Sequence, residues 1–269
     1  MPDLVHLNRL DIADIHDPSI LALRLHEMLG PITTAVPVVE IAKSLDIMDI
    51  RLDRFDGFEG MLLTDKVRST GSILANTNKG ARRARFTVAH ELGHFLMERH
   101  QFIDTTGFIC TSGNLRETRE SQQLLHQETQ ANQFAIELLA PTSLVMPWMS
   151  AEPDLRDALQ LRKHLDVSLE ACVRRMVTLR EEPLAAIWSH EGRMQYFAAT
   201  RNFPFITLKR GDPIPQTSAA SRVISRGDRG STTFVGTHPF PWTERQDLNL
   251  HEQTRVAANS HAVTLLWVE

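Results

Sequence analysis

The sequence predicts an α+β fold, in which strands and helices fall in separate stretches of the chain. Three observations support this class. Short runs with strand character fill much of residues 47–77. Two long stretches with the apolar periodicity of a helix follow, one after Gly80 and one over residues 117–139. Strand-like runs return after Pro183. We therefore expect a mixed first domain at 1–140, a helical bridge at 141–182 and a sheet-containing C-terminal domain at 183–269.

The N-terminal elements are predicted from capping residues. Asp17 and Pro18 have the character of an N-cap and a first helical residue, which predicts a helix that runs to Leu29 and stops at Gly30. Pro37 opens a second, shorter helix.

Three strand-like runs separated by glycine-containing turns follow at 47–55, 59–65 and 72–77. Apolar residues then recur at three- and four-residue spacing after Gly80, which predicts a helix. Residues 101–114 are rich in Gly, Thr and Ser and are expected to form a loop. An extended peptide substrate could add to an exposed sheet edge, and we expect that edge at 59–65 or 72–77.

The bridge and the C-terminal domain have less regular patterns. Residues 141–181 predict short helices of helix-turn-helix proportions. Six aromatic residues of the C-terminal domain could line a ligand pocket or form its core: Trp188, Phe197, Phe205, Phe234, Phe240 and Trp242. We expect most of them to form the core, with Phe240 and Trp242 as the least certain. Its predicted strands are 185–189, 194–199, 205–210, 232–236 and 262–269.

The composition excludes several classes of protein. The net charge of −4 and the pI near 6.3 give no general attraction to nucleic acid or anionic membranes. No apolar run approaches the roughly 20 residues that span a bilayer. The first residues do not resemble a signal peptide, and two cysteines cannot form a disulfide framework. We expect a cytoplasmic protein without a membrane segment.

One predicted helix carries the clearest chemical signal. In FTVAHELGHFLMERH, residues 86–100, His90 and His94 are four residues apart and can bind one metal ion from the same helix face. Glu91 points elsewhere on the helix and can reach a water molecule beside the metal. Zinc lowers the pKa of such a water to about 7, and a carboxylate can take its proton as it attacks a carbonyl. Gly93 predicts close approach by another element. The alternative is a pair of histidines held by ordinary local hydrogen bonds.

The third metal ligand has to come from elsewhere. His100 would suit the HExxHxxGxxH pattern, but Met97 replaces the glycine that breaks the helix, so we do not expect His100 to be a ligand. In HQETQANQFAIELLAP, Glu128 shares a face with small alanines, and Asn132 can accept a hydrogen bond from a ligand imidazole. Glu128 is the predicted ligand. The weaker candidates are Cys110, His126 and Asp104.

These two segments resemble the ImmA/IrrE family of zinc metallopeptidases. FTVAHELGHFLMERH matches its metal helix, and ETQANQFAIELLAP resembles its E-x-x-A-N-x-F-A-x-x-L-L-x-P signature. The similarity is strong over residues 35–141 and weaker beyond. Thr-Gln follows Glu128 where a second acid is common, which leaves Glu128 as the acid available there.

The resemblance implies a small zincin-like, thermolysin-like core with Zn2+ held by His90, His94 and Glu128, and Glu91 as the general base. It also implies an endopeptidase that cleaves a helix-turn-helix repressor or antitoxin and so derepresses stress-response or mobile-element genes. The C-terminal domain would be a sensor, with a GAF-like fold.

Two other functions compete with this one. The chain could be a regulator that binds its partner without cleavage and uses zinc as a structural element. It could also be a DNA-binding regulator that uses Arg174, Arg175 and Arg180, although we expect these residues to serve packing and expect no direct nucleic-acid binding. The donor to the transition-state oxyanion is not evident; His100 and His126 are candidates, while the single tyrosine, Tyr196, lies in the C-terminal domain.

Overall fold

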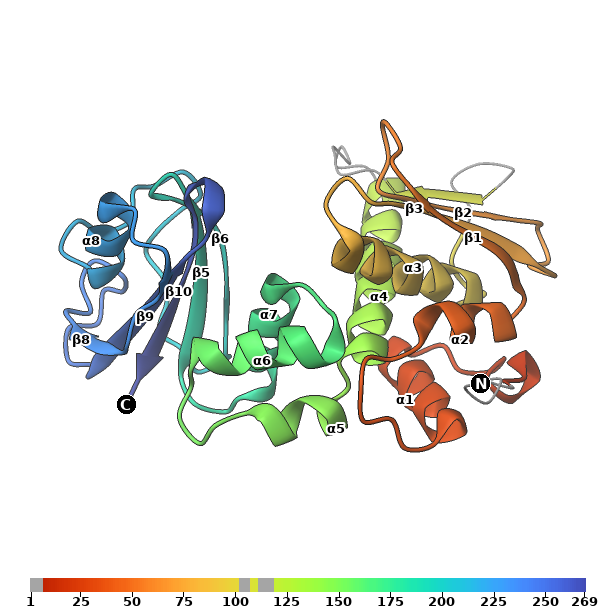
Figure 1. The fold of residues 1–269 in the computed structure, drawn as a ribbon, viewed down its shortest axis with the longest axis horizontal. Coiled ribbons are helices and arrows are strands. Elements are labelled where there is room, and N and C mark those ends of the chain that lie inside the picture. The colour runs from red at the N-terminus through yellow and green to blue at the C-terminus, as the bar shows by residue number, and fades with distance from the viewer. Residues whose placement is uncertain (1–6, 102–106, 111–118) are drawn as a thin grey trace. The chain divides into compact units, whose positions relative to one another are not determined.

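The computed structural model describes residues 7–101, 107–110 and 119–269. The chain forms two compact units: Met1–Met146 with Lys163–Ser168, and Pro147–Arg162 with Leu169–Glu269. Both units contain helices and strands (Figure 1), so the predicted α+β class is confirmed. The boundaries predicted at residues 140 and 182, the zincin-like core and the GAF-like domain stay predictions.

The first unit packs helices against a four-stranded sheet of order β1-β3-β2-β4. Strands β1 and β3 are parallel, and the other neighbours are antiparallel. The strands are β1 (Ile47–Asp53), β2 (Gly60–Thr64), β3 (Gly71–Asn76) and β4 (Gly107–Cys110). The helices are α1 (Pro18–Leu29), α2 (Val38–Ser44), α3 (Ala81–Leu96), α4 (Arg119–Leu139) and α5 (Thr142–Val145).

The sequence signals at the first helix have the expected physical effect. The side chain of Asp17 accepts hydrogen bonds from the amides of Ser19 and Ile20, both at 2.9 Å, and Pro18 occupies the first turn. Gly30 ends the helix with a φ of 72°, a conformation that favours glycine. The predicted bounds of this helix are confirmed.

Helices α3 and α4 approach closely at a glycine. A Cβ atom on Gly93 would lie 2.9 Å from Cδ1 of Phe134, so an alanine there would overlap the ring. On α4, Ala131 and Ala135 are completely buried. Small residues on both helices therefore explain how they can share one site, as predicted for Gly93.

The predicted substrate edge is wrong. Strand β3 lies between β1 and β2, and β2 lies between β3 and β4, so neither has a free edge. Within the described residues, β1 and β4 are the edge strands. Strand β4 formed in a segment predicted to be a loop.

The second unit is built on an antiparallel sheet of order β6-β5-β10-β9-β7, with β8 also paired to β9. Its strands are β5 (Leu184–His190), β6 (Arg193–Ala199), β7 (Gly230–Ser231), β8 (Val235–Thr237), β9 (Leu250–Val256) and β10 (His261–Val268). Its helices are most of α6 (Leu155–Leu165), α7 (Leu169–Leu179) and α8 (Ala219–Arg226). Short 3-10 helices occur at Arg9–Asp11, Met146–Trp148 and Ala258–Ser260.

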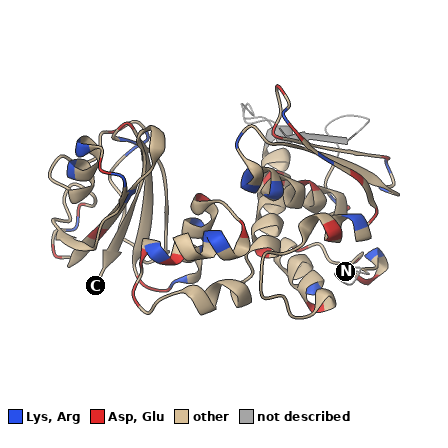
Figure 2. Cartoon of the chain, viewed as in Figure 1, with Lys and Arg blue, Asp and Glu red and all other residues tan. Residues whose placement is uncertain are grey.

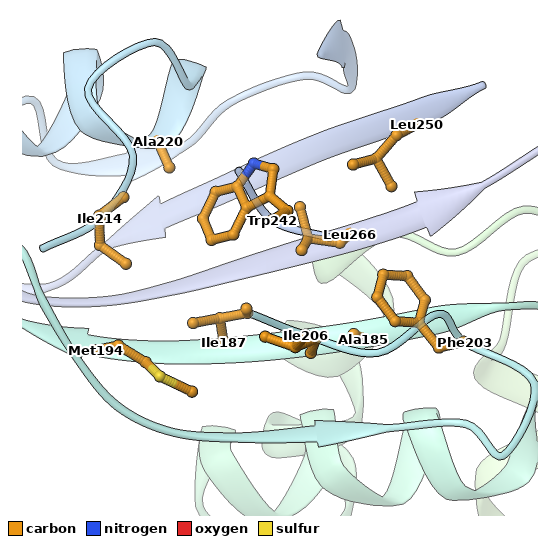
Figure 3. Packing of buried hydrophobic residues seen from close by; sticks show 10 residues of the cluster. All are labelled: Ala185, Ile187, Met194, Phe203, Ile206, Ile214, Ala220, Trp242, Leu250 and Leu266. Carbon is orange, nitrogen blue, oxygen red and sulfur yellow. The ribbon is translucent and has the colours of Figure 1, made fainter. Parts of the chain in front are cut away.

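The core of the second unit differs from the one predicted. Of the six aromatic residues considered, Trp242 is fully buried, whereas Phe205 is 78% exposed and Phe240 is 56% exposed. Trp242 packs among small and aliphatic residues of the sheet and of the segments that pack on the sheet, as Figure 3 shows. The buried cluster consists of Ala185, Ile187, Met194, Phe203, Ile206, Ile214, Ala220, Trp242, Leu250 and Leu266.

Of the predicted strands in this unit, 205–210 is wrong and 232–236 is correct only at its last two residues, which begin β8. Residues 205–210 contribute one isolated bridge, between Ile206 and Thr243, and residues 232–236 lie mostly between β7 and β8. Strand β9 was not predicted because Glu252, Gln253 and Thr254 give it a polar sequence, yet all three are buried.

Acidic and basic residues are interspersed in both units (Figure 2). Among the described residues, no helix is long and apolar enough to cross a membrane.

Candidate metal centre

Helices α3 and α4 bring three potential metal ligands together. His90, His94 and Glu128 each offer a ligand atom, and these atoms all lie within 4.8 Å of one another. Nε2 of His90 lies 3.2 Å from Oε2 of Glu128, and Nε2 of His94 lies 3.2 Å from Oε1. The two Nε2 atoms are themselves 3.2 Å apart. All three side chains therefore aim their donor atoms at one point.

The helix geometry explains this convergence. His90 and His94 lie one turn apart on the buried face of α3 and are 7% and 0% exposed. Glu128 comes from α4 at the close crossing, and its side chain keeps 30% exposure. The site is therefore closed on the side of His94 and reaches solvent on the side of Glu128.

Both imidazoles are held by a second hydrogen bond. Nδ1 of His90 lies 3.1 Å from Oδ1 of Asn132, the contact expected for that asparagine. Nδ1 of His94 lies 2.9 Å from Nδ1 of His100. These contacts leave Nε2 of each ligand candidate directed at the common point.

The charges of the metal-free cluster suit a cation. Burial lowers the pKa of His94 to about 4, so its imidazole is neutral near pH 7. Burial would raise the pKa of Glu128, but hydrogen bonds with His90 and His94 lower it well below its usual range. Burial also opposes protonation of His90, yet Glu128 and Glu91 together raise its pKa, so a metal ion that binds here has to displace a proton from this imidazole. Two imidazole nitrogens and one ionised carboxylate form a donor set that fits zinc with a remaining open position.

Glu91 lies beside this set and is completely buried. Its carboxyl group packs against Gly60 of β2, where a Cβ atom would overlap Oε1 of Glu91 and Cγ2 of Thr87. Sequence reasoning missed Gly60, since nothing in the local pattern links a strand glycine to a helix carboxylate. A glycine at this position leaves Glu91 the space that its carboxyl group occupies.

His100 is not a member of the ligand group. Helix α3 ends at Leu96, and the chain then turns so that His100 faces the far side of His94. Its Nε2 lies 3.2 Å from Oε1 of Gln130, so both ring nitrogens have contacts within the protein. This arrangement argues against the predicted role of His100 as an oxyanion donor.

The other candidates play no part in the described cluster. His126 is exposed and, with His100 and Gln130, lines a separate cavity of about 210 Å³. Its oxyanion role stays a prediction. Asp104 and the side chain of Cys110 lie outside the described residues.

The three arginines in the first turns of α3 have partners within the protein. Arg82 pairs with Asp166 at 3.0 Å, Arg83 pairs with Glu59 at 2.6 Å, and Arg85 donates to the carbonyl of Val36. Each of these three side chains therefore has a contact within the protein.

Comparisons with known proteins identify the family of the chain. A search of curated proteins finds no significant match. The structure of a Mycobacterium tuberculosis transcriptional regulator is similar, with a TM-score of 0.60 and 14% sequence identity, over 97% of this chain and 79% of that one. At this identity the likeness shows a shared fold. The model of the IrrE N-terminal-like domain, peptidase family M78, matches residues 38–177, which include the two helices of the cluster. Because the match spans more than half of the 269 residues, the chain belongs to the IrrE N-terminal-like peptidase family.

Proposed function

We propose that this protein is a zinc-dependent endopeptidase that cleaves a regulatory protein. The observation that carries the proposal is the convergence of His90, His94 and Glu128 beside the buried carboxyl group of Glu91. A site that serves only to hold a fold has no use for an acid next to the metal. Membership in a peptidase family supports the same function.

In this mechanism His90, His94 and Glu128 would hold zinc, and the bound ion would supply Lewis acidity at the site. Glu91 accepts the proton of the attacking water and passes it to the departing amine. The side-chain oxygen of Asn132 accepts a hydrogen bond from the Nδ1–H group of His90 and so holds this ring in place. Gly60 leaves room for the carboxyl group of Glu91.

The substrate is an extended segment that adds to the edge of β4 that has no neighbouring strand among the described residues. Strand β4 pairs with β2, and its register places Cys110 opposite Gly60, the residue that contacts Glu91. A peptide on this edge would be separated from Gly60 by β4 alone, at about two strand spacings from the residue beside the proposed base. The other edge strand, β1, lies at the opposite edge of the sheet.

The regulatory partner is a helix-turn-helix repressor or antitoxin. Its support is the family resemblance of the two motif segments, and a transcriptional regulator among proteins of similar fold is compatible with it. The role of the second unit as a sensor has the same support and is part of the proposal.

Direct DNA binding is not part of the proposal. Arg174 pairs with Glu170 at 3.1 Å, Arg175 is 4% exposed, and Arg180 is 8% exposed. These are the residues that a helix-turn-helix role would need at the surface.

The test uses Glu91→Gln, which removes the base and keeps the size of the side chain. Wild type and variant are each used to capture partners from host cells, and the captured proteins are quantified by mass spectrometry. We expect an intact partner to accumulate on the variant and two fragments of it to appear with wild type. The rate of cleavage should fall by about 10²- to 10⁴-fold, while the zinc content stays the same.

The matched control is Glu27→Gln, which changes an exposed glutamate of α1 that pairs with Arg24. It should behave as wild type. Capture of the same intact partner by wild type and Glu91→Gln would contradict cleavage and favour the regulator that binds without cutting.

A further inference from the structure

A histidine and a glutamine form a chain of contacts behind the metal-ligand candidate His94. Nδ1 of His94 lies 2.9 Å from Nδ1 of His100, and Nε2 of His100 lies 3.2 Å from Oε1 of Gln130. We infer that His100 positions His94 for metal binding and that Gln130 selects the tautomer of His100 that can do so. This inference rests on the proposed metal site but not on peptide cleavage.

The direction of the hydrogen bonds follows from the geometry. Nε2 of His94 faces Glu128 and His90, so a neutral His94 that binds a cation there carries its proton on Nδ1. That N–H group needs an acceptor, and Nδ1 of His100 provides one when its own proton is on Nε2. The amide oxygen of Gln130 accepts from this Nε2–H group and favours that tautomer. Each donor in the chain thus has one acceptor.

His100 is itself held in place from behind. Its amide donates to the carbonyl of Met97 at 3.0 Å. Arg68, which is 4% exposed, donates to the carbonyl of Met97 at 2.6 Å and to the carbonyl of His100. A guanidinium at the C-terminal end of a helix is also favoured by the helix dipole. Arg68 therefore fixes the turn that brings His100 back to His94.

The two ligand candidates on α3 are supported differently. His90 contacts the exposed Asn132, whereas His94 contacts His100, which is 4% exposed. Helix α4 supplies Glu128, and the supporting contacts of both histidines end on this helix. Those of His90 end at Asn132, and those of His94 end, through His100, at Gln130. A small shift of α4 would thus disturb a proposed ligand and both supports together.

A purely structural role for His100 makes a different prediction from a positioning role. As a space-filling residue, it could be replaced by leucine with little effect on metal affinity. As an acceptor, it requires an atom near Nδ1, which the side-chain oxygen of asparagine can supply. The comparison of leucine with asparagine therefore separates the two roles.

The experiment measures the zinc affinity of the full chain by competition with a chromophoric chelator. We expect His100→Leu to bind zinc about 10- to 100-fold more weakly than wild type, the usual cost of losing an outer hydrogen-bond partner. His100→Asn should recover most of this loss. The visible absorption of Co2+ should change with His100→Leu and stay close to wild type with His100→Asn. Thermal unfolding of the metal-free variants shows whether each is folded.

Gln130→Met provides a second test if His100→Leu fails to fold. It removes the acceptor for Nε2–H at a half-buried position and should weaken zinc binding by a smaller factor, about 3- to 10-fold. Gln123→Met, at an exposed position two turns earlier on α4, is its matched control and should bind as wild type.

Unchanged zinc affinity in folded His100→Leu, or in Gln130→Met, would overturn the inference. Equal losses in folded His100→Leu and His100→Asn would also overturn it. Failure of wild type to bind zinc would instead remove the proposed function, so the two failures are distinguishable.

Discussion

The helix pairs α3/α4 and α6/α7 both carry buried charged or polar side chains, but they arrange them in opposite ways. On α3 and α4, His90, His94 and Glu128 aim their donor atoms at one common point. Around α6 and α7, buried charges instead form a pair, between Asp157 of α6 and Arg180, the residue that follows α7. Asp157 and Arg180 face one another at 3.6 Å, with side chains 3% and 4% exposed.

The difference shows how to separate a site from a structural contact. Like groups that converge, such as two Nε2 atoms 3.2 Å apart, leave a place for a cation to bind. Arg180 leaves no such place, because it also pairs with Glu182 and donates to the carbonyls of Ser150, Ala151 and Glu152. Arg180, one of the three arginines considered for DNA binding, thus packs within the second unit.

The largest expected effect comes from breaking the paired arrangement. Arg180→Met keeps much of the side-chain length but leaves Asp157 and three carbonyls without a guanidinium. We expect the second unit to lose about 3–5 kcal/mol of unfolding free energy, the usual cost of removing one partner of a buried ion pair. Zinc affinity of the first unit should not change.

Tryptophan fluorescence during urea unfolding measures this effect selectively. All four tryptophans, Trp148, Trp188, Trp242 and Trp267, lie in the second unit. The control is Arg156→Met, whose side chain is 72% exposed and pairs with Asp154. It should cost less than about 1 kcal/mol. A similar loss in both variants would show that the buried arrangement has no special role.

The convergent site was accessible to sequence reasoning because helical geometry is local. A four-residue spacing fixes the relative direction of His90 and His94, and small residues indicate where a second helix approaches. The same argument identified Glu128 and Asn132 on α4, which lie where it placed them. These contacts required only two helices and one crossing.

The missed features depend on contacts between distant segments. His100 lies beyond the last helical residue, so helical spacing could not place its ring against His94. The edges of the first sheet depend on which strands pair, and the parallel pairing of β1 with β3 brought β3 into the interior. The polar side chains of β9 are buried because they have hydrogen-bond partners in distant segments. Glu252 accepts hydrogen bonds from the amides at the start of α8, and Gln253 accepts one from the amide of Leu155. Local patterns do not contain this information.

A second prediction concerns the precision that the convergent site needs. In Gly60→Ala, the added methyl group overlaps the space of Oε1 of Glu91 and must displace its carboxyl group. A displacement of about 1 Å from a reactive geometry costs about 10²-fold in rate. We expect cleavage of the captured partner to slow by about this factor, with zinc affinity unchanged because no proposed ligand moves.

The control for this prediction is Gly236→Ala in β8, where a Cβ atom would meet open space. It should cleave at the wild-type rate. Full activity of Gly60→Ala would show that Glu91 tolerates displacement, which is the behaviour expected of a paired structural group rather than a catalytic one.

The smallest expected effect is a change in the pKa of Tyr196, which lies beside the pair formed by Glu170 and Arg174. Burial, and then the negative charge of Glu170, raise the pKa of Tyr196 to about 12, while Arg174 opposes them. The guanidinium of Arg174 lies 4.9 Å from the ring of Tyr196 and 4.8 Å from that of Trp188. Since burial is the larger cause, Glu170→Gln should lower this pKa by less than about one pH unit.

Tyr196 is the only tyrosine, so the ultraviolet absorbance of its phenolate reports this pKa directly. A raised pKa in the folded state stabilises the protein at pH values below the unfolded pKa of about 10, and this stability is lost as the pH rises through about 12. Glu170→Gln should therefore shift the titration to lower pH, and the exposed control Glu244→Gln should leave it in place. A titration near pH 10 in the folded wild type would show that Glu170, Arg174 and Tyr196 are separate surface groups. In that case Tyr196 would not belong to a set of paired groups. The contrast between paired side chains in the second unit and converging side chains in the first would then not extend to this position.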